Sequence, residues 1–178
     1  MFNANDSTII AIDIQEKLVN MFSHKESIVA NCTKLLKSAK ILNVDTILTE
    51  QYPKGLGETI TAIKEIGNFK TIEKTTFSAL ATPEFKEEFN KTKNKNIILF
   101  GIETHICVLQ TALDLLNRDC NVFVVADCCA SRSEYNKTIA LDLMKQYGCK
   151  IVTLEIVLFE FLKSSKHPSF KEVQGLIK

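Results

Sequence analysis

The sequence predicts an α/β protein built on a doubly wound parallel sheet, with helices on both faces in three layers. Two observations point to this class. Short apolar runs rich in β-branched residues alternate with longer segments of helical periodicity, which is the pattern of successive β-α-β units. The apolar runs are nearly continuous, as in TIIAIDI and VFVVAD, and parallel strands covered on both faces have this character.

Six segments are predicted to be strands. In chain order they are residues 8–14, 45–49, 69–72, 96–100, 121–126 and 150–153. The segments between them are long enough for the crossover connections that parallel strands require. The sheet is therefore expected to contain six parallel strands.

Helical periodicity fills most of the intervening segments. Apolar residues over 28–42 predict a long helix, and Ser23 with Glu26 has the spacing of a capping box at its start. Thr82 and Pro83 form a cap and first-turn pair for a second helix. Further helices are predicted over residues 106–116, from residue 133 onward, and over the terminal segment 168–178.

Composition narrows the class of function. No repeat or linker divides the chain, so residues 1–178 are expected to form one domain. The 22 basic and 21 acidic residues give a net charge of +1, which argues against a nucleic-acid partner. No leader-like segment opens the chain and no apolar run approaches the ~20 residues that span a bilayer. A cytoplasmic protein without a membrane partner is expected.

Metal and cofactor sites are not predicted. The six cysteines form no CxxC pair, and the three histidines are isolated from one another in the sequence. Without a secretory signal the cysteines should be reduced rather than paired as disulfides. The remaining candidates for chemistry are acidic, basic and thiol side chains.

Two charged residues stand where ligands bind in such sheets, beyond the carboxyl ends of the strands. Asp13 ends the first strand, in an apolar run where an ionised carboxylate needs a partner or a purpose. Lys74 follows the third strand and could stabilise a nearby thiolate or carboxylate. The alternatives stay open, because Asp13 could cap a helix and Lys74 could simply extend into water. Asp127 is a similar strand-end acid.

Cys107 is the strongest nucleophile candidate. It lies in GIETHICVLQT, where Gly101 closes the fourth strand and Thr104 can cap the following helix. The first-turn position predicts that free amides and the positive helix end favour a thiolate. Cys128 and Cys129 are the competitors, although small residues at a strand end more often serve packing. His105 is a poor base for Cys107, because residues two apart on a helix point in nearly opposite directions.

Four fragments carry a family resemblance. AIDIQ, EKTTFSA, LFGIETHICVLQTALDLLNR and VFVVADCCASRS occur in an order and at strand ends that resemble the isochorismatase-like cysteine hydrolases. TEQYPKGLG and HPSFKEVQGLIK are most similar to the eukaryotic isochorismatase domain-containing proteins. The resemblance covers nearly the whole chain.

The resemblance implies a strand order of 3-2-1-4-5-6 and a catalytic group made of Asp13, Lys74 and Cys107. Asp13 would accept the thiol proton, Lys74 would stabilise the charged pair, and Cys107 would attack a carbonyl to form a thioester. It also implies a cis peptide between Ile102 and Glu103, with the amides of Glu103 and Cys107 binding the oxyanion. The residues implied to line the substrate cleft are Gln15, Tyr52, Phe77 and Thr104.

The expected substrate is a small molecule with an amide C–N bond. Nicotinamidases of this superfamily bind a metal through an Asp and His set after strand two, but TEQYPKGLG contains no histidine. The alternative function is a catalytically silent binding or scaffold protein that keeps the fold. A homo-oligomer is expected from the resemblance and from the apolar segment 151–162, IVTLEIVLFEFL.

Overall fold

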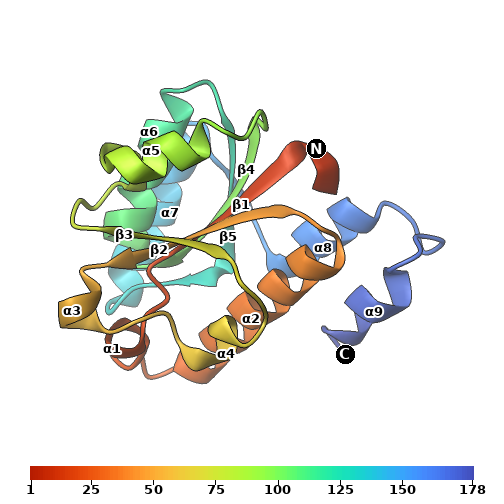
Figure 1. The fold of residues 1–178 in the computed structure, drawn as a ribbon, viewed down its shortest axis with the longest axis horizontal. Coiled ribbons are helices and arrows are strands. Elements are labelled where there is room, and N and C mark those ends of the chain that lie inside the picture. The colour runs from red at the N-terminus through yellow and green to blue at the C-terminus, as the bar shows by residue number, and fades with distance from the viewer.

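The computed structural model describes residues 1–178 and contains one six-stranded sheet in which every neighbouring pair is parallel (Figure 1). The strand order is β3-β2-β1-β4-β5-β6, which confirms the expected order. The strands are β1 (Ser7–Ile12), β2 (Asp45–Gln51), β3 (Lys70–Lys74), β4 (Asn96–Ile102), β5 (Asn121–Ala130) and β6 (Lys150–Val152).

Helices cover both faces of the sheet. Helices α2 and α8 contact each other and β5 on one face, whereas α6 and α7 contact each other and β5 on the other (Figure 1). The α-helices are α1 (Glu16–Val19), α2 (Lys25–Ile41), α3 (Pro53–Leu56), α4 (Thr61–Lys64), α5 (Pro83–Phe89), α6 (Leu109–Leu116), α7 (Glu134–Gln146), α8 (Leu154–Leu162) and α9 (Phe170–Gly175). Short 3-10 turns at η1 (Ala4–Asp6) and η2 (Ala79–Ala81) and a π-helix, η3 (Thr104–Val108), complete the chain. The predicted three-layer α/β class is confirmed.

The two central strands have the most buried side chains. All six residues of β1 are buried, and β4 is buried from its second residue to its last. Full burial of each aliphatic side chain stabilises the fold by about 1.5–3 kcal/mol relative to exposure. This explains why the strands are continuously apolar rather than alternating.

Helix starts agree only in part with the expected caps. Helix α2 begins at Lys25 with His24 at its N-cap, so the capping box of Ser23 and Glu26 is wrong. The Thr82 side chain does not cap α5, because its hydroxyl bonds that of Thr76 at 2.8 Å. Ser133 does cap α7, accepting a hydrogen bond from the amide of Asn136. Thr82 and Pro83 do occupy the N-cap and first-turn positions of α5, as expected, although the Thr82 hydroxyl bonds elsewhere.

Strand β5 runs past its expected end at residue 126. It continues to Ala130 with an irregular register opposite Leu99 and Gly101. Asp127 therefore lies within the strand, where its Oδ1 accepts a hydrogen bond of 2.8 Å from the amide of Leu154. This amide opens α8 and has no partner within the helix. Asp127 serves to cap α8.

The apolar segment 151–162 is mostly helix α8. Its buried residues pack against the chain's own sheet, and of its apolar residues only Ile156 and Phe159 remain exposed, at 43% and 44%. Most of the apolar side chains that suggested an oligomer interface are therefore buried within the chain itself. None of the helices combines the length and apolar character that crossing a bilayer would need.

Gly101 in β4 provides a test of how closely the central strands approach. Its φ is +132°, and a Cβ there would lie 2.1 Å from the carbonyl oxygen of Ile12 in β1. We expect Gly101→Ala to lower the free energy of unfolding by about 2–3 kcal/mol or more. Urea unfolding measures this, with Gly175→Ala as the control because a Cβ there meets nothing within 4 Å. Equal stabilities of the two variants would contradict the prediction.

Candidate active site

Asp13 lies just beyond β1 and is fully buried. Its φ is 52°, a left-handed conformation that aspartate tolerates better than most residues. The carboxylate accepts a hydrogen bond of 2.7 Å from the Thr49 hydroxyl on one oxygen and one of 2.7 Å from Lys74 on the other. One oxygen is therefore held from β2 and the other from β3.

Lys74 is the last residue of β3, and its side chain is fully buried. Its Nζ lies 2.7 Å from Asp13 Oδ2 and 2.6 Å from Gln51 Oε1. The carbonyl oxygens of Thr76 and Phe77 lie at 3.2 Å. A buried ammonium needs this number of acceptors, because its desolvation is otherwise uncompensated.

Cys107 belongs to the π-helix η3, just ahead of α6, and is 7% exposed. Burial raises the pKa of its thiol to about 12, and the Asp13 carboxylate adds to this rise while Lys74 opposes it. Burial and the Asp13 carboxylate thus oppose the thiolate that the first-turn position was expected to favour.

The electrostatics of Asp13 and Cys107 are mutual. Burial raises the pKa of the Asp13 carboxyl above its ordinary value of 3.8, while Lys74 and then Thr49 and Cys107 lower it. The thiol and the carboxylate are thus close enough that each changes the protonation of the other. The Asp13 carboxylate just beyond β1, the Lys74 ammonium of β3 and the Cys107 thiol of η3 therefore lie together in one buried site.

The segment between β4 and η3 carries a second ion pair. The peptide bond between Ile102 and Glu103 is cis. The Glu103 carboxylate, 5% exposed, accepts hydrogen bonds from Arg132, whose Nε and Nη2 both lie 2.9 Å from Oε1. His105 Nδ1 lies 3.4 Å from Glu103 Oε2 and 3.0 Å from the Ser131 hydroxyl. Segment 103–105 is thereby attached to the end of β5.

The four expected cleft residues fall into different environments. Gln15 is fully buried, and its amide bonds the backbone of Gln51 and Gly57 through three hydrogen bonds. Tyr52 and Phe77 are 55% and 52% exposed. Thr104 is fully buried, and its hydroxyl has no hydrogen-bond partner. Only Tyr52, Phe77 and Thr104 therefore have groups free for a ligand.

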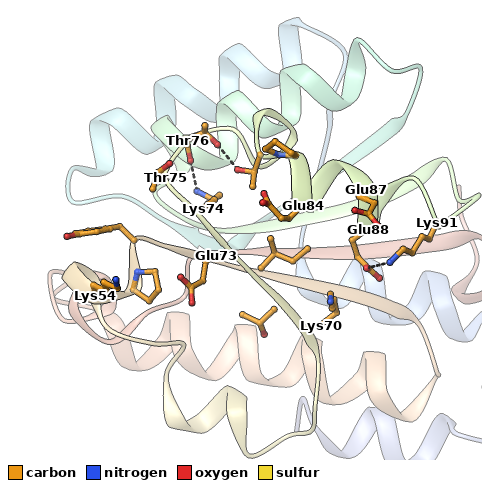
Figure 2. A pocket seen from close by; sticks show the side chains of 16 residues that line it. Lys54, Lys70, Glu73, Lys74, Thr75, Thr76, Glu84, Glu87, Glu88 and Lys91 are labelled. Atoms are coloured by element: carbon orange, nitrogen blue, oxygen red, sulfur yellow. Dashed lines mark hydrogen bonds and ion pairs between the residues drawn. The ribbon is translucent and has the colours of Figure 1, made fainter.

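A cavity of about 750 Å³ lies along the edge strand β3 (Figure 2). Glu84, Glu87 and Glu88 of α5 and Lys91 just beyond it line the cavity, together with Lys54 of α3. Tyr52, the residue before α3, also lines it. Lys74 also borders the cavity, but Asp13 and Cys107 do not. This cavity is thus next to the site described above, which it touches only at Lys74.

Sequence reasoning missed two residues that hold the site. Thr49 and Gln51, at the end of β2, bind Asp13 and Lys74 directly. Their signal was the polar ending TEQ of an otherwise apolar strand. The pairing of Glu103 with Arg132 had no signal, because the two residues lie 29 positions apart.

Comparison with known proteins identifies the family. Residues 7–156 match the isochorismatase domain. The isochorismatase domain-containing protein 2 of Xenopus laevis is 43% identical over 174 residues, covering 96% of this chain and 83% of the relative. The chain belongs to the isochorismatase family and has the general fold of its hydrolases.

Two solved structures show the same fold. A structure described as MAR1 ribonuclease from Caenorhabditis elegans is 40% identical with a TM-score of 0.93, covering 99% of this chain and 91% of that one. The YcaC gene product of Escherichia coli, described as an octameric hydrolase of unknown specificity, is 23% identical with a TM-score of 0.89, covering 99% and 94%. The likeness to YcaC concerns the fold alone.

The protonation of Cys107 can be tested directly. Burial and the Asp13 carboxylate both disfavour the thiolate, so the difference in thiolate absorbance between wild type and Cys107→Ser should be absent at pH 9.0, the ordinary pKa of a thiol. Because the folded-state pKa is raised, this thiol contributes stability below pH 9.0 that is lost as the pH rises toward about 12. A Cys107-dependent thiolate signal near neutral pH would contradict this.

Proposed function

We propose that the chain is a hydrolase that cleaves the amide C–N bond of a small molecule through a thioester on Cys107. The observation that carries this proposal is the buried pair of Lys74 and Asp13, 2.7 Å apart, beside the thiol of Cys107. A carboxylate, an ammonium and a nucleophile held together away from water are the groups that covalent acyl transfer requires.

The proposed first half-reaction begins with proton transfer from the Cys107 thiol to the Asp13 carboxylate. The sulfur attacks the substrate carbonyl carbon, and the carbonyl oxygen takes the negative charge toward the amides of Glu103 and Cys107. The C–N bond then breaks, and the leaving nitrogen takes the proton from Asp13. The products are an amine or ammonia and a thioester.

In the proposed second half-reaction, water attacks the thioester carbonyl while Asp13 accepts a proton from it. Collapse of this intermediate releases the carboxylic acid, and the proton returns to the sulfur. Lys74 remains charged throughout and offsets the negative charge that moves between Asp13 and Cys107. A resting thiol suits this sequence, because the thiolate then forms only as its proton passes to Asp13 during the attack.

Substrate contacts are proposed for Tyr52, Phe77 and Thr104. Tyr52 and Phe77 are half-exposed aromatic residues, and the carbonyl of Phe77 bonds Lys74. The unpartnered hydroxyl of Thr104 lies three residues before Cys107 and could bond a substrate group. Gln15 is better placed to hold the loop between β2 and α3. We treat residues 1–178 as one catalytic domain without a cofactor.

The main alternative is a binding protein that keeps the fold but does not turn over substrate. The relative from Caenorhabditis elegans, described as a ribonuclease, adds RNA to the candidate substrates. The net charge of +1 supports a small uncharged or weakly charged substrate instead. Assays of ammonia release from a panel of small amides, with an RNA substrate in parallel, distinguish an amide hydrolase, a ribonuclease and a binding protein without turnover. Amide turnover without RNA cleavage is expected.

We expect Cys107→Ala to abolish amide turnover while preserving the fold, because it removes the atom that forms the thioester. Cys32→Ala is the matched control, since Cys32 is fully buried in α2 and its thiol bonds the carbonyl of Cys128. This control should retain the wild-type rate and lose about 1–2 kcal/mol of stability. Wild-type turnover by Cys107→Ala on an established substrate would refute the nucleophile assignment.

We also propose a homo-oligomer. YcaC, a protein of the same fold, is described as octameric, and Ile156 and Phe159 of α8 expose apolar surface that a second copy could cover. Light scattering at micromolar concentration should give a single mass that is a whole-number multiple of 20.0 kDa, the mass of one chain. A mass of one chain across the concentration range would rule this out.

A further inference from the structure

The carboxylate of Glu103 presents an electrostatic problem for the proposed reaction. Its side chain is 5% exposed, and its backbone amide is one of the two proposed oxyanion donors. The substrate oxygen would thus gain negative charge near a residue that already carries one in a buried place. Like charges in such a setting disfavour each other strongly.

Arg132 contacts both oxygens of this carboxylate. Its Nε lies 2.9 Å from Oε1 and 3.3 Å from Oε2, and its Nη2 lies 2.9 Å from Oε1. The Arg132 backbone amide donates to Oε2 at 3.3 Å. The Arg132 side chain is 60% exposed, so the cation closes the buried carboxylate off from the solvent side.

We infer that Arg132 is a positioning residue for the reaction at Cys107, and that it acts by neutralising Glu103. The pair holds the segment from Glu103 to Cys107 against the end of β5 and cancels the charge that would oppose an anion there. This inference rests on the proposed function. It assigns Arg132 no contact with the substrate.

If the Arg132 cation matters only because it neutralises the Glu103 carboxylate, the effects of the two substitutions will not be additive in a double-mutant cycle. Arg132→Ala removes the guanidinium and leaves the buried carboxylate of Glu103 with His105 Nδ1, at 3.4 Å, as its remaining side-chain partner. Glu103→Gln removes that charge while keeping nearly the same shape. The second substitution should therefore repair the damage done by the first.

The first experiment measures kcat and KM on an amide that the screen identifies. Arg132→Ala is expected to lower kcat by about tenfold or more with KM nearly unchanged. The double variant Glu103→Gln with Arg132→Ala should return to within about threefold of wild type. Arg118→Ala is the matched control, because Arg118 is the other arginine of the chain and bonds Asn90 near the start of β5.

The second experiment needs no turnover. Acrylamide reacts with a thiol when the sulfur bonds the β-carbon, the C=C electron pair moves onto the carbonyl oxygen as an enolate, and the thiol proton ends on the α-carbon. Mass spectrometry of the Cys107 peptide gives the rate near neutral pH. Arg132→Ala should slow this adduct by about tenfold, and adding Glu103→Gln should restore it.

The outcomes separate the two hypotheses. If Arg132→Ala lowers kcat and the acrylamide rate but the double variant does not restore them, the inference is overturned. Arg132 would then either bind the ligand directly or only stabilise the local structure. Unchanged kinetics in Arg132→Ala would also overturn it. Repair of the acrylamide rate in a protein that hydrolyses no amide would support the inference and refute the proposed function.

Discussion

The buried ion pair of Lys74 and Asp13 is the interaction on which the site depends. Both side chains are fully buried, on β3 and just beyond β1, two strands that are separated by β2. Breaking such a pair by removing one partner typically costs about 3–5 kcal/mol, because the remaining charge is left uncompensated. In the intervening strand β2, Thr49 bonds Asp13 and Gln51 bonds Lys74. The ion pair therefore also fixes the relative positions of the ends of three strands.

The same burial determines the state of the thiol. A site dry enough to strengthen the pairing of Lys74 with Asp13 is also dry enough to disfavour a thiolate on Cys107. The ammonium of Lys74 lowers the pKa of the thiol but does not offset the effect of burial. Desolvation therefore explains why a nucleophile candidate can be present and still be neutral at rest.

A second ion pair, between Glu103 and Arg132, involves the segment that leads into Cys107. Glu103 and Arg132 join the end of β4 to the end of β5, as Lys74 and Asp13 join β3 to β1. The two pairs differ in exposure, because Lys74 is fully buried whereas the Arg132 side chain is 60% exposed.

The sequence by itself determined the fold class, the approximate strands and the positions of Asp13, Lys74 and Cys107, because continuous apolar runs and strand-end polar residues are local signals. The tertiary structure brings Glu103 to Arg132 and Asp127 to the first amide of α8, and the burial it creates raises the pKa of the Cys107 thiol. It also decided that β5 continues to Ala130 and that residues 154–162 form a helix against the chain's own sheet. These outcomes depend on burial and on partners distant in the sequence, and no local pattern encodes how much water a folded chain excludes.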